Sequence, residues 1–140
     1  MTDDEIERLA TGFCACTLPK AQWTHGAHFA TALWLILQRP EIIAERDMPA
    51  MIRRYNESVG GVNSDTGGYH ETITQASLYM TRALLAGLPP DVTPASSFAT
   101  LMASPLGDKD GLFTYWSQDT LMSVAARRNW VAPDLQSLPA

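Results

Sequence analysis

The sequence predicts an all-α protein, a single-domain helical bundle of about five to seven helices. Apolar residues recur at spacings of three and four along most of the chain, and no segment shows the strict alternation of a half-buried strand. Proline and glycine separate these segments at intervals typical of helices. The chain has 140 residues, of which 46% are hydrophobic and 18% charged, as expected for one folded domain, residues 1–140.

The first two helices are expected before Pro40. Asp3 or Asp4 can cap a helix that runs to about residue 11, where Gly12 ends it. The second helix is expected over residues 18–38, with a proline in its first turn. It is apolar nearly all round, so we predict that it is central and buried. One of its stripes comprises Trp23, Ala27, Ala30, Trp34 and Leu37.

Glycine and proline divide the middle of the chain. The segment from Pro40 is expected to break near residues 47–49, where Asp47 can cap a second helical piece that ends near Val59. Residues 60–68 contain four glycines and form either a flexible connector or a loop that folds over a pocket.

The C-terminal half is expected to contain one long helix and several short ones. The long helix runs from about Tyr69 to Ala86 and is followed by glycine and two prolines. Thr93 then caps a short helix that Pro105 ends. Short helical turns and an extended tail over 133–140 complete the chain.

The charge balance narrows the classes of partner. The chain carries 10 Lys and Arg residues against 15 Asp and Glu, a formal net charge of −5 at pH 7. Nucleic-acid binding depends on clustered basic residues, so we expect no nucleic-acid partner. The longest apolar stretch, 27–37, is too short to span a bilayer, and the acidic N-terminus does not resemble a secretory signal. We therefore expect a cytoplasmic protein with no membrane partner.

The three histidines are candidate metal ligands. His25 and His28 are three residues apart, so both imidazoles lie on one helix face, and His70 begins the helix expected after the glycine-rich segment. The three side chains converge if the N-terminal ends of these two helices pack together. Three neutral imidazoles, with Glu71 or water as a further ligand, suit Zn(II), Fe(II), Mn(II) or Ni(II). A metal with an open position could activate water or polarise a substrate oxygen.

Other interpretations of these residues stay open. One histidine could act as a general base oriented by Glu71 without a metal, which makes His70 and Glu71 candidate catalytic residues. Alternatively, the histidines could form a hydrogen-bonded core cluster that fixes helix register and binds nothing. The candidate pocket residues beside them are Trp23, Tyr55, Tyr69 and Thr74.

Two sequence blocks carry a family resemblance. W-T-H-x-x-H at residues 23–28 and G-Y-H-E-T-I-T at residues 68–74 resemble a family of small uncharacterised bacterial all-helical proteins, and residues 115–135 are similar to the end of that family. The resemblance implies the helical fold and no particular chemistry. A looser similarity is to histidine-lined four-helix metalloproteins of the DinB type, although this sequence lacks their widely spaced histidine triad.

Three functions are compatible with the sequence. The first is a cytoplasmic helical protein whose His/Glu-lined pocket binds a divalent metal and acts on a small molecule by hydrolysis or group transfer. The second is a metal-free small-ligand binder or enzyme that uses His–Glu pairing. The third is a non-catalytic interaction or assembly module, for example a homo-oligomer in which Phe113, Tyr115 and Trp116 form the subunit contact.

Overall fold

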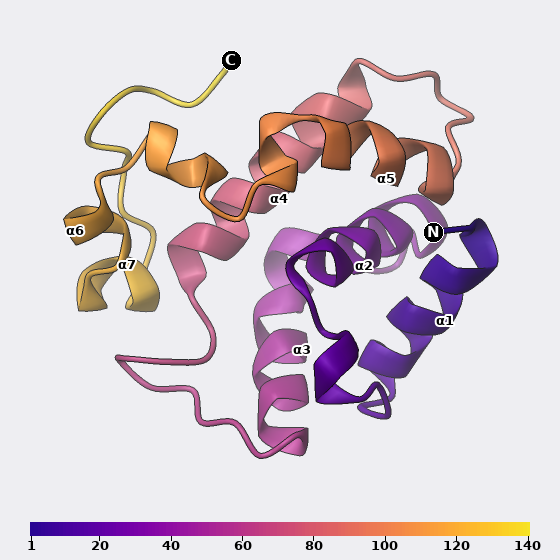
Figure 1. Ribbon diagram of the computed structural model, residues 1–140, viewed down its shortest axis with the longest axis horizontal. Coiled ribbons are helices and arrows are strands. Elements are labelled where there is room, and N and C mark those ends of the chain that lie inside the picture. Colours follow the sequence, from indigo (N-terminus) through magenta and orange to yellow (C-terminus); the bar gives the residue numbers. More distant parts are fainter.

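The computed structural model describes residues 1–140 and confirms the all-α prediction (Figure 1). Seven α-helices and three short 3₁₀ turns make up the fold, with no β-strand. The α-helices are α1 (Asp3–Cys14), α2 (His25–Gln38), α3 (Ala44–Ser58), α4 (Glu71–Ala86), α5 (Pro94–Ala103), α6 (Gln118–Leu121) and α7 (Val124–Arg128). The 3₁₀ turns span Lys20–Gln22, Pro105–Gly107 and Gly111–Thr114.

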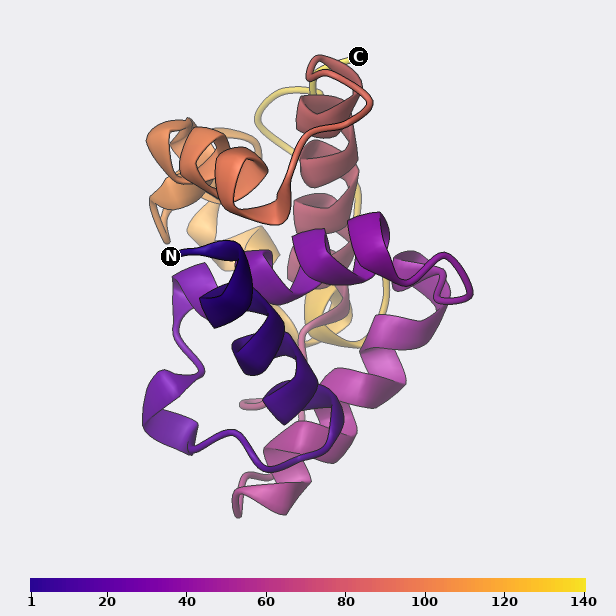
Figure 2. The same cartoon turned by 90° about the vertical axis from the view of Figure 1, so that its right-hand side faces the viewer.

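Helix α2 is the central element, as predicted. It contacts α1, α3, α4 and α5, and eight of its 14 residues are buried. Figures 1 and 2 show α1 and α3 beside α2, with α4 and α5 together on its other side. Helix α7 packs on α4, and the C-terminal tail continues past it along the outside of the molecule. Helix α2 begins at His25, and helix α4 begins directly after His70. These two helices are neighbours in the fold.

The core consists of three clusters of buried side chains. The largest joins α1, α2 and α3 around Phe13, Leu35 and Tyr55. A second cluster includes Phe29 and Leu106, and a third surrounds the fully buried Trp116. The indole N–H of Trp116 donates to the carbonyl of Val131 at 2.9 Å, so this residue is part of the core and not of the predicted subunit contact. No helix combines the length and the apolar character that crossing a bilayer requires.

Helix α1 differs from its prediction at both ends. Its N-cap is Thr2, not an aspartate, because Thr2 and Glu5 form a reciprocal capping box. The helix also continues past Gly12 to Cys14. A Cβ on Gly12 would lie 3.4 Å from the Leu18 side chain, an ordinary contact distance, so Gly12 neither ends the helix nor is required by its packing.

Helix α2 begins later than predicted. Thr24 is its N-cap and accepts a hydrogen bond from the backbone N–H of Ala27, so the regular helix starts at His25. Trp23 precedes the helix and does not belong to its apolar stripe. This start places Trp23, Thr24 and His28 close together around the first turn.

Helix α3 is one continuous helix, whereas the sequence predicted a break at residues 47–49. Pro49 lies inside it and has no N–H to donate to the carbonyl of Glu45, four residues earlier. The side-chain amide of Gln75 donates to that carbonyl at 3.0 Å, from the neighbouring helix α4. A tertiary hydrogen bond thus replaces the missing helical one. Asp47 lies within the first turn and accepts from the N–H of Ile43.

Candidate functional site

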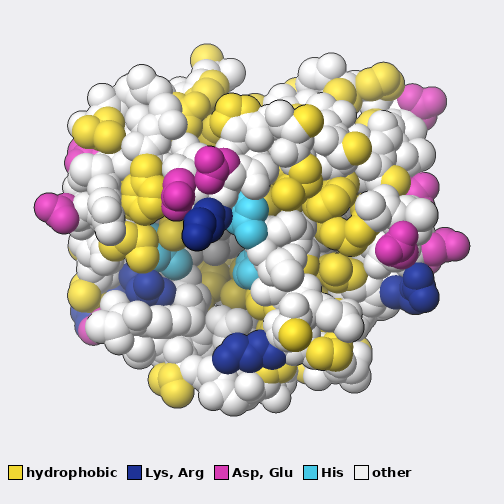
Figure 3. Space-filling model, in the orientation of Figure 1, with side chains coloured by type: hydrophobic (Ala, Val, Ile, Leu, Met, Phe, Trp, Pro, Cys, Tyr) yellow, Lys and Arg dark blue, Asp and Glu magenta, His cyan; other side chains and the backbone are white.

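Two adjoining cavities open on one face of the molecule. The first has a volume of about 430 Å³ and the second about 520 Å³. They share five lining residues: His28, Ile52, Ile73, Thr74 and Met122. The two cavities adjoin between α2, α3 and α4, and together they are called the cleft. Figure 3 shows histidine and basic side chains gathered at the hollow in this face.

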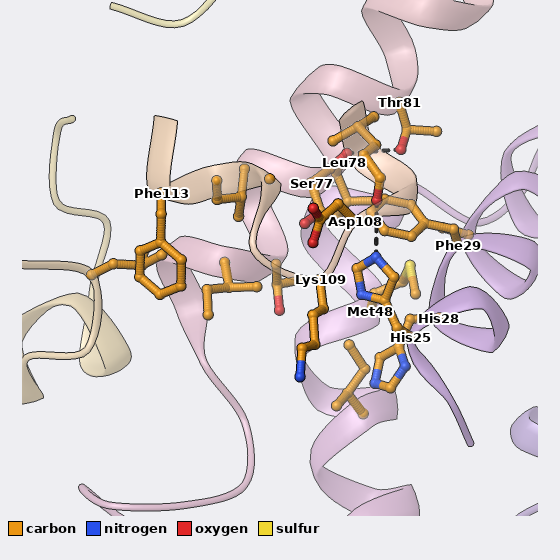
Figure 4. A pocket seen from close by; sticks show the side chains of 18 of the residues that line it. His25, His28, Phe29, Met48, Ser77, Leu78, Thr81, Asp108, Lys109 and Phe113 are labelled. Atoms are coloured by element: carbon orange, nitrogen blue, oxygen red, sulfur yellow. Dashed lines mark hydrogen bonds between the residues drawn. The ribbon is translucent and has the colours of Figure 1, made fainter. Parts of the chain in front are cut away.

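The first cavity is mainly apolar. Eleven of its 19 lining residues are hydrophobic, and members of all three core clusters contribute to its wall, among them Ile52, Phe29 and Leu112. Its polar residues comprise two histidines (His25, His28), three hydroxyl residues (Thr74, Ser77, Thr81) and the neighbours Asp108 and Lys109. Figure 4 shows His25, His28 and Lys109 on one side of this cavity, with Ser77 and Thr81 above them.

His28 lies where the two cavities meet. Its Nδ1 is 2.6 Å from the carbonyl oxygen of Thr24. A carbonyl only accepts, so Nδ1 carries the proton and Nε2 is left as an acceptor without a partner in the protein. The ring packs on the indole of Trp23, with centroids 3.9 Å apart. Two neighbours therefore fix both the position and the tautomer of this imidazole.

The environment of His28 favours its neutral form. Protein atoms packed around the ring partly desolvate it and lower the pKa of His28 below its ordinary 6.5, although the residue is solvent-exposed, and the nearby His25 acts in the same direction. The hydrogen bond to Thr24 raises the pKa and only partly offsets this shift. The residue keeps access to solvent through the cleft. His28 is thus a neutral, reachable acceptor near pH 7.

His25 lines only the first cavity. Its Nε2–H donates to the carbonyl of Leu106 at 2.9 Å, which leaves Nδ1 without a partner in the protein. The ring also makes an edge contact with Phe29, with centroids 5.1 Å apart. This histidine links α2 to the turn Pro105–Gly107 and forms part of the cavity wall.

His70 has a structural position at the start of α4. Its Nδ1 accepts from the backbone N–H of Ile73 at 3.1 Å, which makes it the N-cap, and its Nε2–H donates to the carbonyl of Leu121 at 2.6 Å. Burial lowers the pKa of His70, and the bond to Leu121 opposes that shift. Both ring nitrogens are used within the protein, so His70 has none left for a metal or a substrate.

Glu71 does not pair with a histidine. Its carboxylate accepts from the Tyr69 hydroxyl and, at 3.5 Å, from the amide of Gln75. Burial and this carboxylate raise the pKa of Tyr69. Glu71 is not among the residues that line either cavity. The predicted orientation of a histidine by Glu71 is therefore not formed.

The structure does not assemble the predicted three-histidine metal centre. No group of three or more His, Cys, Asp or Glu side chains is arranged to hold a metal ion. Only His25 and His28 keep an open ring nitrogen, so a metal in the first cavity would have two imidazole ligands from the protein. Metal binding by this pair stays a prediction.

The second cavity contains all four residues predicted to line a pocket, Trp23, Tyr55, Tyr69 and Thr74. Tyr55 is fully buried and donates its hydroxyl proton to the carbonyl of Leu18 at 2.8 Å. The sequence analysis missed Lys20 and Arg127 in the wall of this cavity. No local pattern marks them, because they come from a 3₁₀ turn and from α7, far apart in the chain.

Comparison of the chain with known proteins identifies no family. Nothing matches the chain among protein-family models, curated proteins or solved structures.

Proposed function

We propose that this protein binds a small molecule in the cleft and acts on it with His28 as a general base, in hydrolysis or group transfer. The observation that carries the proposal is the open Nε2 of a neutral, oriented imidazole at the junction of the two cavities. A general base needs a free acceptor within reach of the substrate and a pKa near or below the working pH. His28 meets both conditions.

The proposed step is a proton transfer that needs only this chain and its substrates. Nε2 of His28 takes the proton of a bound O–H nucleophile, water or an alcohol, as the nucleophile's oxygen forms the new bond. The resulting imidazolium can return the proton to the leaving group. The Thr24 carbonyl stabilises this imidazolium through Nδ1–H, while Trp23 holds the ring plane. Trp23 and Thr24 are thus positioning residues.

This proposal changes the roles expected of the other histidines. His70 supports the start of α4, and His25 anchors the turn Pro105–Gly107 while it lines the first cavity. The metal-free alternative is favoured, with the difference that a backbone carbonyl orients the base instead of Glu71.

Kemp elimination of 5-nitrobenzisoxazole tests for a positioned base in an apolar cavity. The base removes the C–H proton of this flat aromatic molecule as its N–O bond breaks, and the phenolate product absorbs visible light. We expect the protein to accelerate the reaction, and His28→Gln to remove the acceleration. A positioned general base contributes about 10²–10⁴-fold. The rate should level off at a pH below about 6.5, where His28 loses its proton.

His25→Gln is the matched control, because glutamine can still donate to the Leu106 carbonyl. This variant should keep most of the rate. Equal rates for the wild-type protein and His28→Gln would refute the proposal. A rate that is lost with a chelator and restored by Zn(II) would favour the metal-dependent interpretation.

A further inference from the structure

The second cavity has a positive lining in an acidic protein. The whole chain has 15 acidic and 10 basic residues, yet this cavity is lined by Lys20 and Arg127 and by no aspartate or glutamate. In the first cavity Asp108 and Lys109 balance each other. The cleft therefore has one apolar, charge-balanced half and one cationic half.

Most other polar groups of the second cavity are already used. The Tyr55 hydroxyl donates to Leu18, the Asn56 amide donates to Asn63, and both nitrogens of His70 have partners. The side-chain groups with hydrogen-bonding capacity left for a ligand include the Lys20 ammonium, the remaining N–H groups of Arg127, the indole N–H of Trp23 and Nε2 of His28. The Lys20 ammonium and the Arg127 guanidinium carry positive charge near pH 7.

Arg127 differs from its neighbour Arg128 in its partners. Arg128 forms a two-point ion pair with Asp65, at 2.8 and 2.6 Å. Arg127 has no carboxylate partner, and its Nη1 donates to the carbonyls of Gly68 and Tyr69 at 3.0 and 3.4 Å. Four arginines of the chain pair with carboxylates, and Arg127 is not one of them. These bonds hold an uncompensated guanidinium at the cavity wall.

The starts of two helices add to the positive potential. His28 is in the first turn of α2, and Thr74 is in the first turn of α4, so both helices begin at the cleft. A helix N-terminus has a partial positive charge of about half an elementary charge. This contribution adds positive potential where the two cavities meet, because His28 and Thr74 line both of them.

From these observations we infer that the ligand of this cleft is an amphipathic organic acid. Its carboxylate, or an anionic group of similar size, binds between Lys20 and Arg127, and its apolar body fills the first cavity. The atoms between these two parts then lie beside Nε2 of His28, which lines both cavities. The inference deepens the proposed function by naming its substrate class, but the binding itself does not depend on proton transfer.

Calorimetric titration with octanoate and octanamide tests this inference. The two probes have the same chain length and similar head groups, and only octanoate is charged. We expect octanoate to bind at least about tenfold more tightly, because a hydrogen bond to a charged group contributes roughly 1.5–3 kcal/mol, which corresponds to about tenfold or more in affinity. Added salt should weaken octanoate binding and leave octanamide binding nearly unchanged.

Lys20→Glu is the most direct variant, because the side chain of Lys20 is exposed and makes no hydrogen bond that the fold requires. It should weaken octanoate binding about tenfold or more and leave octanamide binding unchanged. Arg8→Glu changes the net charge equally outside both cavities, and it should bind octanoate like the wild-type protein.

Two outcomes would overturn the inference: equal affinity for octanoate and octanamide, or an equal loss of octanoate binding in Lys20→Glu and Arg8→Glu. Absence of measurable octanoate binding would do the same. His28→Gln separates this inference from the proposed function. If that variant loses the elimination activity but still binds octanoate, both stand. If the wild-type protein binds octanoate but does not accelerate the elimination, only the proposed function fails.

Discussion

Thr72→Val is expected to destabilise the fold, whereas the same substitution at Thr31 is not. Both threonines are fully buried, in α4 and α2 respectively. The hydroxyl of Thr72 donates to the carbonyl of Asn129 at 2.8 Å and accepts from the N–H of Val131 at 3.0 Å. The hydroxyl of Thr31 has no hydrogen-bond partner. Valine keeps the shape of threonine and removes only the hydroxyl.

The expected magnitude follows from the bonds that each substitution removes. Thr72→Val removes two hydrogen bonds, each with a net contribution of about 0.5–1.5 kcal/mol, and leaves two backbone groups to find water. Asn129 and Val131 retain solvent access, so we expect a loss of about 2 kcal/mol in the free energy of unfolding. At about 2 cal/mol/K per residue, the unfolding entropy of this chain makes that roughly 7 °C in Tm. Thr31→Val removes an unsatisfied polar group and should change stability by between about 0 and +1 kcal/mol.

Urea unfolding followed by circular dichroism measures both variants. The slope of the free energy against urea concentration should stay constant, so that a shift in midpoint reports stability alone. A loss for Thr31→Val as large as that for Thr72→Val would refute the reasoning, because the two sites differ mainly in hydrogen bonding. It would show that the methyl packing of valine, not the missing hydroxyl, decides the outcome.

Three further predictions concern pH and backbone geometry. Folding lowers the pKa values of His28 and His70, so the unfolded chain takes up protons at these residues before the folded protein does. The free energy of unfolding should therefore be greatest above about pH 6.5 and fall as the pH decreases through the folded pKa values. Urea unfolding across this range measures the change. Three hydrogen bonds, the first from the Ser117 hydroxyl, lower the pKa of Asp134 to about 2, so Asp134→Asn should reduce the further loss of stability between about pH 4 and 2. Gly68→Ala should destabilise the fold by about 2 kcal/mol or more, since Gly68 has φ 77° and its added Cβ would lie 2.6 Å from a side-chain oxygen. Gly67→Ala, with nothing within 4 Å of its Cβ, is the control.

Each of these has a clear contrary result. Stability that stays level or rises from about pH 6.5 to 5 would contradict the histidine shifts. An unchanged acid transition in Asp134→Asn would mean that other carboxylates govern it, of which Asp47, with a pKa lowered to about 2 by Arg46, is the leading case. Equal effects of the two glycine substitutions would remove the argument from backbone conformation.

The elements of the fold follow from local sequence patterns, and the errors arise where tertiary contacts override them. Apolar periodicity was sufficient to predict α2 as the buried centre, and the pairing of a capping threonine with proline correctly predicted α5. Pro49 was expected to break α3, and it does not, because Gln75 of another helix satisfies the carbonyl that proline leaves without a donor. Sequence spacing within α3 contains no information about that contact.

The candidate site shows the same division between local and long-range information. The residues around the first turn of α2 and the start of α4 were identified because their pattern is local. Lys20 and Arg127 were not, because only the folded chain brings a turn near the N-terminus beside α7. Glu71 does not line either cavity, and its carboxylate accepts from the hydroxyl of Tyr69, only two residues away, so its catalytic role stays a prediction.

The roles of the three histidines depend on backbone carbonyls that the sequence does not reveal. An imidazole offers two nitrogens, and each carbonyl that accepts from one of them fixes the tautomer of the ring. His70 uses both nitrogens for the fold, whereas His25 and His28 each use one. Of these two, only His28 lines both cavities. The i, i+3 spacing that suggested a shared ligand set does place the two imidazoles on one helix face. Their hydrogen bonds differ, because His25 bonds to the turn at Leu106 whereas His28 bonds to Thr24 at the start of its own helix.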